Sequence, residues 1–383
     1  LGIVPDSPSD TLMINIGGQL QVSRNGLPIE PVRSGAWQAE IEILHMFADF
    51  YQIARDQIRG YVTSGGTEGN LACLWWSREY LKIKFGQMPV LFLSDQAHYS
   101  VHKIANILGL TSCIVRADEK GRMDLECFSQ LIRQHVQKLP NQPVMICATI
   151  GSTQMGAIDD VPALKQILTA EMGNNQFTIH VDAALLGAVL PIIKPFKEVD
   201  RLFNYMDTIA ISGHKFLGTT SICGVALAKR EILEYTYQNK DILVKYVGGI
   251  QDTTVSGTRS GKIVMELHLA MCSLDMNSDY TRLKKLVTQC LINASYLRIR
   301  LGCIVGVQNI TYQSGQFVVV FPRPSNENAA EQLENKYGLM TVGDSRFAVC
   351  VLAPVDKKLI DEFLVDYVAS VNQEKKVSLR ACL

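Results

Sequence analysis

Short apolar runs alternate with helix-like patterns over most of this chain, and that alternation constrains the fold more than any other feature. Strands that alternate with helices predict an α/β fold, with a mostly parallel central sheet covered by helices on both faces. Functional groups then gather where strands end and helices begin. The expected strands span residues 60–63, 90–93, 113–115, 144–147, 177–181, 208–211 and 225–228. The expected helices span residues 34–51, 66–82, 99–108, 125–136 and 161–171.

The pattern changes after residue 262 and predicts a smaller α+β unit. Two long helical stretches between residues 262 and 300 come first. Residues 1–34, by contrast, are rich in Pro, Gly and Ser and show no steady period. Beyond the two helical stretches, the expected elements are strands 317–320 and 347–350 and a final helix at 358–371. The sequence therefore predicts three parts: an N-terminal segment 1–45, a large domain 46–261 and a small C-terminal domain 262–383.

Charge and cysteine usage exclude several classes of protein. Lys plus Arg and Asp plus Glu both total 37, so neither a nucleic-acid nor a membrane partner is expected. No apolar stretch is long enough to span a bilayer. The ten cysteines form no CxxC pair, so no metal is expected, and reduced thiols favour a cytoplasmic protein. The chain begins with Leu, and we expect a processed chain or a fragment without a signal peptide.

Lys215 lies just after an apolar strand, in the sequence Ser-Gly-His-Lys that begins at Ser212. Lysines avoid the ends of buried strands unless they are paired or chemically used. A desolvated lysine loses its proton more readily and becomes a nucleophile toward an aldehyde. The alternative is a surface lysine in a strand-to-helix turn, and the position alone does not decide between the two.

Asp182 closes another apolar strand, in the sequence His-Val-Asp-Ala-Ala that begins at His180. A carboxylate at the end of a buried strand is costly without a cationic partner, and a protonated pyridine nitrogen is such a partner. That ion pair keeps the ring positive, so the ring can accept electrons released at a substrate α-carbon. Ala184 has the same strand parity and leaves room for a flat ring. In the alternative, Asp182 only caps the next turn.

A glycine-rich turn and a histidine complete the pattern. The turn, Thr-Ser-Gly-Gly-Thr-Glu-Gly-Asn over residues 63–70, opens a helix, where free N–H groups and the helix dipole bind phosphate. It has neither the Walker A sequence nor the Rossmann glycine spacing. His98 follows a strand and can stack on a flat cofactor, although a lone histidine is more often structural, as we expect for His102. All four elements lie at strand ends of one sheet, and together they predict a pyridoxal 5'-phosphate site.

The chain resembles the group II pyridoxal-phosphate amino-acid decarboxylases, which have the aspartate-aminotransferase fold (fold type I). Within that family it is most similar to the bacterial histidine decarboxylases and the plant serine decarboxylases. The similarity runs from about residue 34 to about residue 372. The motifs that carry it are YVTSGGTEGN (61–70), AHYSVHK (97–103), IGSTQMGAIDD (150–160), HVDAALLGAVLP (180–191), SGHKFLGTTSICG (212–224) and SGTRSG (256–261).

The resemblance implies decarboxylation of an L-amino acid to its amine and CO₂, with histidine as the first candidate substrate, in a homodimer with sites at the interface. It implies three catalytic residues: Lys215 holds the cofactor as a Schiff base, Asp182 pairs with the ring nitrogen, and His98 stacks on the ring. Thr149 would lie near the ring hydroxyl, and Thr258 would reach the phosphate bound in the partner subunit. The residues implied to hold the phosphate of their own subunit are Gly66, Thr67, Ser212 and His214.

Three departures from the family pattern leave the substrate open. Leu186 stands where many relatives carry a small residue, and it either narrows the pocket or packs against a neighbouring helix. The stretch 258–262 also differs, and the segment before residue 34 echoes the subgroup only at residues 14–17. Two rivals remain: a carbon–carbon lyase of the sphingosine-phosphate type, and an inactive homologue that acts as a binding partner.

Overall fold

The computed structural model describes residues 21–22, 28–29, 35–173, 176–193, 202–236, 243–244, 250–312 and 315–381. A seven-stranded sheet forms its centre, with the strand order β3-β9-β8-β7-β6-β4-β5. Its pairings are parallel except the two made by β9, which runs antiparallel to β3 and β8. The strands are β3 (Ile58–Thr63), β4 (Val90–Ser94), β5 (Thr111–Val115), β6 (Val144–Thr149), β7 (Phe177–Asp182), β8 (Thr208–Ser212) and β9 (Gly224–Lys229).

Continuous apolar runs explain why these strands form the middle of the fold. Strands β4, β6, β7 and β8 are buried at every residue, as expected for parallel strands with both faces covered. The mostly parallel sheet predicted from the sequence is therefore confirmed. The sequence does not predict the reversal of β9, because apolar content carries no information on strand direction.

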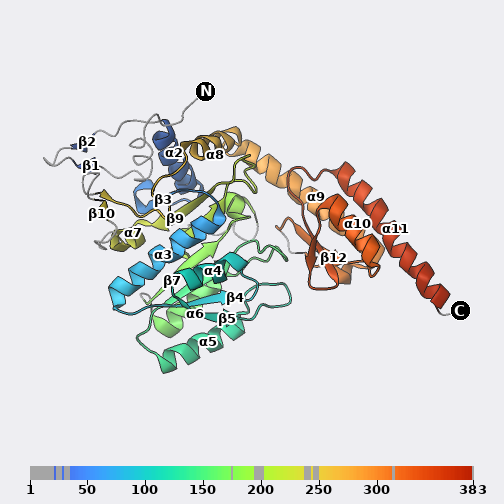
Figure 1. The fold of residues 1–383 in the computed structure, drawn as a ribbon, viewed down its shortest axis with the longest axis horizontal. Helices are drawn as coiled ribbons and strands as arrows, with labels where there is room; N and C mark the ends of the chain where they lie inside the picture. The colour runs from blue at the N-terminus through green and yellow to red at the C-terminus, as the bar shows by residue number, and fades with distance from the viewer. Residues whose placement is uncertain are drawn as a thin grey trace.

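Two groups of helices cover the two faces of this sheet (Figure 1). Helices α3, α4 and α7 share one apolar core with β4, β6 and β9, while α2, α5, α6 and α8 pack into a second, larger core on the other face. Side-chain caps begin α5 and α6, where Asp124 and Asp160 each accept a backbone N–H three residues on. The helices are α2 (Gly35–Phe50), α3 (Gly66–Phe85), α4 (Tyr99–Ile107), α5 (Leu125–Lys138), α6 (Val161–Met172), α7 (Arg230–Thr236) and α8 (Gly261–Ser273).

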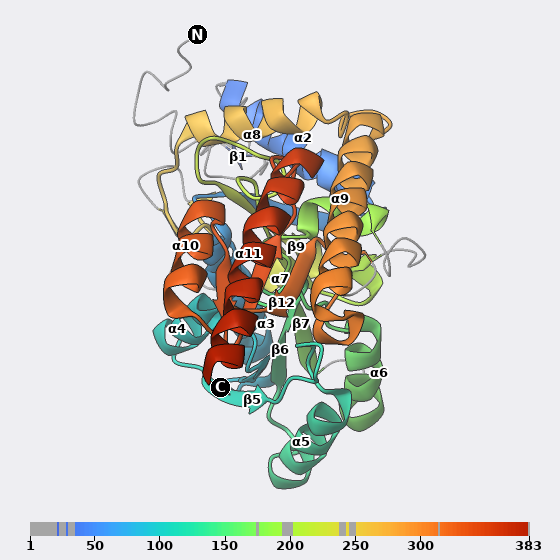
Figure 2. The same cartoon turned by 90° about the vertical axis from the view of Figure 1, so that its right-hand side faces the viewer.

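The C-terminal part has an antiparallel sheet of its own, in the order β12-β14-β13. Figure 2 shows α9, α10 and α11 side by side over this sheet. Helix α9 joins the two parts, because Leu283 and Val287 lie in the large core and Leu297 and Leu301 in the C-terminal one. The elements are α9 (Thr281–Val305), β12 (Val318–Pro322), α10 (Glu327–Tyr337), β13 (Met340–Val342), β14 (Arg346–Cys350) and α11 (Lys357–Ala381). The three-part division by residue number stays a prediction.

Several short elements complete the described chain. No described helix is long and apolar enough to cross a membrane. Most of the expected N-terminal segment, including the echo at 14–17, lies outside the described residues. The short strands are β1 (Gln21–Val22), β2 (Pro28–Ile29), β10 (Leu243–Val244) and β11 (Ile250–Gln251), and the 3₁₀ turns are η1 (Arg55–Gln57), η2 (Gly187–Ile192), η4 (Leu202–Asn204) and η7 (Val307–Asn309).

Candidate active site

A cavity of about 330 Å³ opens where β3, β4, β6, β7 and β8 end. These strands run in one direction, so the side chains that follow them meet at one edge of the sheet. The cavity brings together every site residue predicted from the sequence except Thr258. Those that line it are Gly66, Thr67, His98, Thr149, Asp182, Ala184, Ser212, His214 and Lys215.

The amino end of α3 forms one wall of the cavity. Gly65, the residue before the helix, supplies no side-chain cap, so the helix dipole and the first N–H groups face the cavity without one. A Cβ placed on Gly66 would lie 2.7 Å from Ser212 Oγ and 3.3 Å from Ala184 Cβ. Glycine at this position therefore lets Ser212 and Ala184 approach the helix end closely. An anion such as a phosphate is the ligand that such a helix end favours.

Asp182 ends β7 with its side chain almost fully buried, at 5% residue exposure. Its Oδ2 accepts a hydrogen bond from Asn70 Nδ2 at 2.9 Å, and its Oδ1 accepts one from the Ala184 backbone N–H at 3.1 Å. Both donors are neutral. Within the described part of the chain, no ion pair involves Asp182. A buried carboxylate with neutral donors can accept a cation from a ligand.

His98 is held in one orientation by the first turn of α4. Its Nδ1 accepts the Ser100 backbone N–H at 3.3 Å and lies 2.7 Å from Ser100 Oγ. Because a backbone N–H can only donate, Nδ1 carries no proton, and the proton of the neutral ring sits on Nε2. Burial lowers the pKa of His98, with Asp182 opposing the shift and Lys215 adding to it. The cavity thus contains a neutral, flat imidazole.

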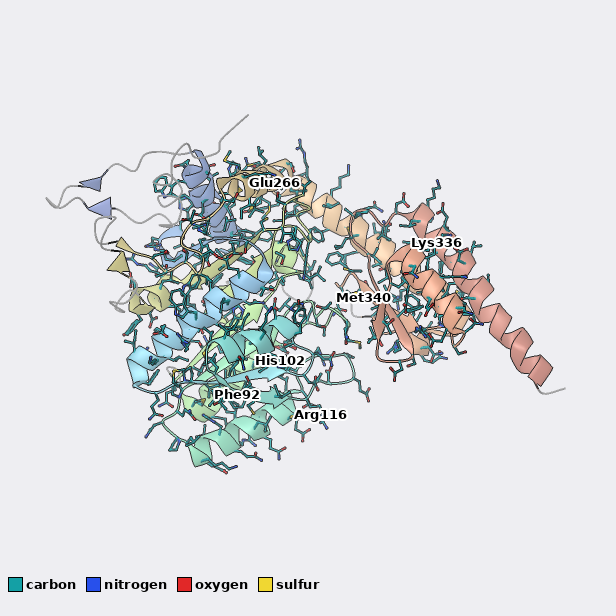
Figure 3. All side chains as sticks on the ribbon, in the orientation of Figure 1. Phe92, His102, Arg116, Glu266, Lys336 and Met340 are labelled. Carbon is teal, nitrogen blue, oxygen red and sulfur yellow. The ribbon has the colours of Figure 1, made fainter. Side chains whose placement is uncertain are left out.

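His102 lies one turn further along α4 (Figure 3). It is exposed and does not line the cavity. Its expected role away from the site agrees with this position.

Lys215 differs from the expectation in one respect. It lines the cavity, but its side chain is exposed rather than buried. Strand β8 ends at Ser212, and the following turn carries Lys215 three residues further, to the rim of the cavity. The desolvation that sequence reasoning assigned to this lysine is therefore wrong for the single chain, whereas its place near Asp182 and His98 agrees with the prediction.

Thr149, at the end of β6, carries a buried hydroxyl without a hydrogen-bond partner in the described structure. Its backbone N–H donates to Asp159 Oδ2 at 2.7 Å, and Met123 N–H donates to Asp159 Oδ1 at 2.7 Å. Burial raises the pKa of Asp159 to about 6, against these two hydrogen bonds. An unpaired buried hydroxyl on a cavity wall is costly unless a ligand pairs with it.

Two sequence-based expectations concern residues outside the cavity lining. Thr258 is exposed, and its implied contact with a partner subunit stays a prediction. Leu186 is only 1% exposed and belongs to the large core, where a Cβ added to Gly151 would lie 2.7 Å from Leu186 Cγ. Strand β7 ends at Asp182, so strand parity does not extend to Leu186. The packing alternative, not the pocket alternative, agrees with the structure.

Sequence reasoning missed several residues of the cavity wall. Asn70 is the most informative of them, because it touches Asp182 directly. Its signal was a polar residue on the buried side of α3, inside a motif already quoted for its glycines. The other wall residues without an assigned role are Ser64, Gly65, Glu68, Ser100, Gly151, Ser152, Thr153 and Ile222.

A second buried polar network lies beside the cavity. Arg259 Nη1 and Nη2 donate to the Glu40 carboxylate, and Nη1 also donates to the Val62 carbonyl at 2.9 Å. Glu40 Oε1 accepts the Val62 backbone N–H at 2.8 Å. The Arg259 guanidinium lies over the Tyr61 ring, with its Cζ 4.8 Å from the ring centroid. This network joins α2, β3 and the segment that leads into α8.

The segment that contains Thr258 is also tied to the cavity wall. Ser256 Oγ donates to Glu68 Oε1 at 3.1 Å, and Tyr61 OH donates to the same oxygen at 3.0 Å. The Val255 backbone N–H donates to Tyr61 OH at 3.1 Å. Since Glu68 lines the cavity, these bonds connect the two regions.

The sequence comparisons with known proteins agree on one family. A family model described as the pyridoxal-dependent decarboxylase conserved domain matches residues 40–258. A histidine decarboxylase from Acinetobacter baumannii (strain ACICU) is 30% identical over 342 residues, covering 88% of this chain and 82% of the relative. Serine decarboxylase 3 from Oryza sativa subsp. japonica is 31% identical over 342 residues, covering 88% and 71%. L-methionine decarboxylase from Streptomyces sp. 590 has a TM-score of 0.73 at 21% identity, covering 94% and 88%, a likeness of fold.

Proposed function

This chain belongs to the pyridoxal-dependent decarboxylase family, and we propose that it converts histidine to its amine and CO₂. It is a pyridoxal-phosphate-dependent amino-acid decarboxylase. One observation supports the proposed site above all others: Lys215, Asp182 and His98 reach one cavity from three different elements, beside an open helix end. Histidine is the proposed substrate because relatives named histidine decarboxylase from several bacterial genera are 30–32% identical to this chain, whereas serine is the second candidate.

The residues around the cavity fit pyridoxal phosphate at three points. The uncapped amino end of α3, which faces the cavity at Gly66, suits a phosphate, which Thr67, Ser212 and His214 would also contact. The unpaired hydroxyl of Thr149 suits the ring hydroxyl. Asp182, with neutral donors alone, suits a protonated ring nitrogen.

Each catalytic side chain has a separate task in this proposal. When bound, the cofactor supplies an electron sink for the pair left at the α-carbon after CO₂ departs. Asp182 would hold the proton on the ring nitrogen, and the neutral His98 ring would lie against the cofactor. Lys215 would hold the cofactor through its side-chain amine. The cavity walls orient the substrate and limit water.

The proposal extends to the assembly and the place of action. We propose a homodimer, in which Thr258 contacts the phosphate bound in the partner subunit, and a cytoplasmic location. Support for Thr258 comes from its exposure and from the bonds that tie its segment to Glu68. The boundaries 45/46 and 261/262 are the proposed limits of the large domain.

Replacement of the lysine tests the site. Lys215→Ala should abolish CO₂ release and the visible absorbance of the bound cofactor, because the covalent attachment is lost. Lys285→Ala, an exposed lysine on α9, is the matched control and should leave both unchanged. Borohydride that still fixed the cofactor to the Lys215→Ala chain would show that another amine holds it.

A substrate panel tests the activity and separates the rivals. The parent is incubated with each proteinogenic amino acid, and CO₂ and amine are measured. Histidine should give the highest kcat/KM. A carbon–carbon lyase would release an aldehyde from a phosphorylated amino alcohol without CO₂, and an inactive homologue would turn over nothing. Either result would overturn the proposal, and preference for serine would overturn its substrate.

A further inference from the structure

A chain of three polar side chains leads from Asp182 into the protein interior, and only its first member, Asn70, also lines the cavity. Asn70 from α3 contacts Asp182, His180 from β7 contacts Asn70, and Thr208 from β8 contacts His180. The three contacts measure 2.9, 3.0 and 2.9 Å. Residue exposures of Asn70, His180 and Thr208 are 2%, 1% and 0%. Buried polar groups so placed must satisfy one another, because water does not reach them.

The chemistry of the groups fixes the direction of every bond in this chain. A carboxylate only accepts, so the Asn70 amide nitrogen faces Asp182 and the amide oxygen faces His180 Nε2. Nε2 must therefore donate. Burial lowers the pKa of His180 to about 3, so the ring is neutral and has one N–H. Its Nδ1 is then an acceptor, and the Thr208 hydroxyl donates to it.

Local packing explains how α3 reaches the carboxylate. A Cβ placed on Gly69 would lie 3.1 Å from Ala210 Cβ and 3.6 Å from the Val225 carbonyl oxygen, so the helix sits close against β8 and β9. In the sheet, His180 pairs with Thr208 and Asp182 with Ala210. Alternation along β7 places His180 and Asp182 on one face, which is the face that α3 covers.

We propose that Asn70, His180 and Thr208 are positioning residues that orient the Asp182 carboxylate and keep its charge available for the ring nitrogen of the cofactor. A cation in the place of Asn70 would neutralise Asp182 and compete with the ring. A neutral donor holds one oxygen without doing so. The chain also prevents rotation of the Asn70 amide, because His180 accepts no bond at Nε2 and the amide nitrogen cannot face an N–H. The inference rests on the proposed cofactor site.

Loss of the Asn70 donor has a defined chemical consequence. A carboxylate that loses a hydrogen bond holds a proton more readily, because that bond favours its charged form. The proton shared with the ring nitrogen then shifts toward Asp182, and the ring becomes a weaker electron sink. The effect should appear in kcat rather than in KM, since Asn70 does not contact the substrate in this proposal.

The test uses isosteric variants of the full chain, reconstituted with pyridoxal phosphate labelled with ¹⁵N in the ring. Asn70→Leu removes both hydrogen bonds of the side-chain amide, the one to Asp182 and the one from His180. Thr208→Val removes the terminal hydroxyl, and Thr178→Val is its matched control. Thr178 lies on the same face of β7, is 1% exposed, and its hydroxyl has no partner in the described structure. The readouts are the ¹⁵N shift of the ring nitrogen, the affinity of the apoprotein for the cofactor, and kcat and KM.

Asn70→Leu should lower kcat about tenfold or more, keep KM within about threefold, and move the ring-nitrogen signal toward its unprotonated position. Thr208→Val should move the signal in the same direction by less, and Thr178→Val should not move it. His180→Leu should move the signal like Asn70→Leu, whereas His180→Gln, whose amide N–H can replace Nε2–H, should keep most of the parent behaviour.

Parent-like signals and rates in both Asn70→Leu and Thr208→Val would overturn the inference. Should Asn70→Leu fail to fold, the comparison of Thr208→Val with Thr178→Val decides alone, because both changes remove one hydroxyl and keep the shape. Failure of the proposed function has a different signature. It would appear in the parent, as absence of bound cofactor or of CO₂ release.

Discussion

Two buried polar networks adjoin the same cavity, and they treat charge in opposite ways. Behind Asp182, the partners are an amide, a neutral imidazole and a hydroxyl, and the described chain forms no ion pair with the carboxylate. Beside β3, the Glu40 carboxylate faces the Arg259 guanidinium, with side-chain exposures of 1% and 4%. One network leaves a charge uncompensated, whereas the other pairs it completely.

The difference separates a ligand site from a structural clamp. A buried charge is expensive, so a protein keeps one unpaired where a ligand will pair it. The pair between Glu40 and Arg259 needs no ligand, and its bonds to Val62 hold α2 and the segment before α8 against β3. This ion pair, which we call the clamp, also anchors the exposed Thr258, because Thr258 precedes Arg259 in the sequence. We therefore expect damage to the first network to affect chemistry, and damage to the second to affect stability.

The largest effect is expected from breaking the clamp. Arg259→Met keeps most of the side-chain volume but leaves Glu40 buried without a cation, and the free energy of unfolding should fall by about 3–5 kcal/mol. Denaturant unfolding of the apoprotein measures the loss. The double variant Glu40→Gln with Arg259→Met should be more stable than Arg259→Met alone, because Gln still accepts the Val62 N–H. A loss below about 1 kcal/mol would mean that the pair is no clamp.

Asp182→Asn should show the opposite profile. The neutral amide cannot hold the ring proton, so kcat should fall at least about 100-fold, equivalent to about 2.7 kcal/mol of barrier. The free energy of unfolding of the apoprotein should fall by less than it does in Arg259→Met, since an uncompensated charge is removed. Turnover within about threefold of the parent would remove Asp182 from its proposed role.

The sequence predicted one of these networks in part and the other not at all. Asp182 could be found because a carboxylate at the end of a continuous apolar run is unusual in itself. The contact of Asn70 with Asp182 could not be found, because it depends on how closely α3 approaches β8 at Gly69, which no periodic pattern records. The pair of Glu40 with Arg259 joins residues 219 positions apart, and nothing local in the sequence links them.

The same limits apply to the fold. Apolar runs predicted all seven strands of the central sheet, but burial on both faces explains such runs only for the inner strands, because the edge strand β5 is mostly exposed. Some elements without a long apolar run were not predicted. Strand β13 has only three residues, and α10 is mostly polar. The parity argument for Leu186 failed because alternation holds only inside a strand, and β7 ends at Asp182.

The pH dependence of stability tests whether His180, in the network behind Asp182, is neutral in the folded protein. The folded-state pKa of His180, about 3, lies below the ordinary value of 6.5. Below pH 6.5, His180 is therefore protonated in the unfolded chain but stays neutral in the folded chain. Its contribution to the free energy of unfolding decreases as the pH falls. Between pH 6 and pH 5 the parent should lose about 1 kcal/mol relative to His180→Gln, measured by denaturant unfolding of both apoproteins. A difference independent of pH would show that His180 titrates normally in the fold.

The smallest effect is expected from an ion pair that lacks burial. Arg133 on α5 donates through Nε to Glu171 on α6 at 2.7 Å, a contact as short as many in the buried networks. The Arg133 side chain is 61% exposed, so water solvates both charges when the pair is broken. Arg133→Met should therefore lower the free energy of unfolding by less than about 1 kcal/mol, and high salt should reduce even this loss. The substitution is the same as Arg259→Met, so the two variants differ mainly in burial. If Arg133→Met destabilised the apoprotein as much as Arg259→Met, burial would not explain why the pair between Glu40 and Arg259 stabilises the fold.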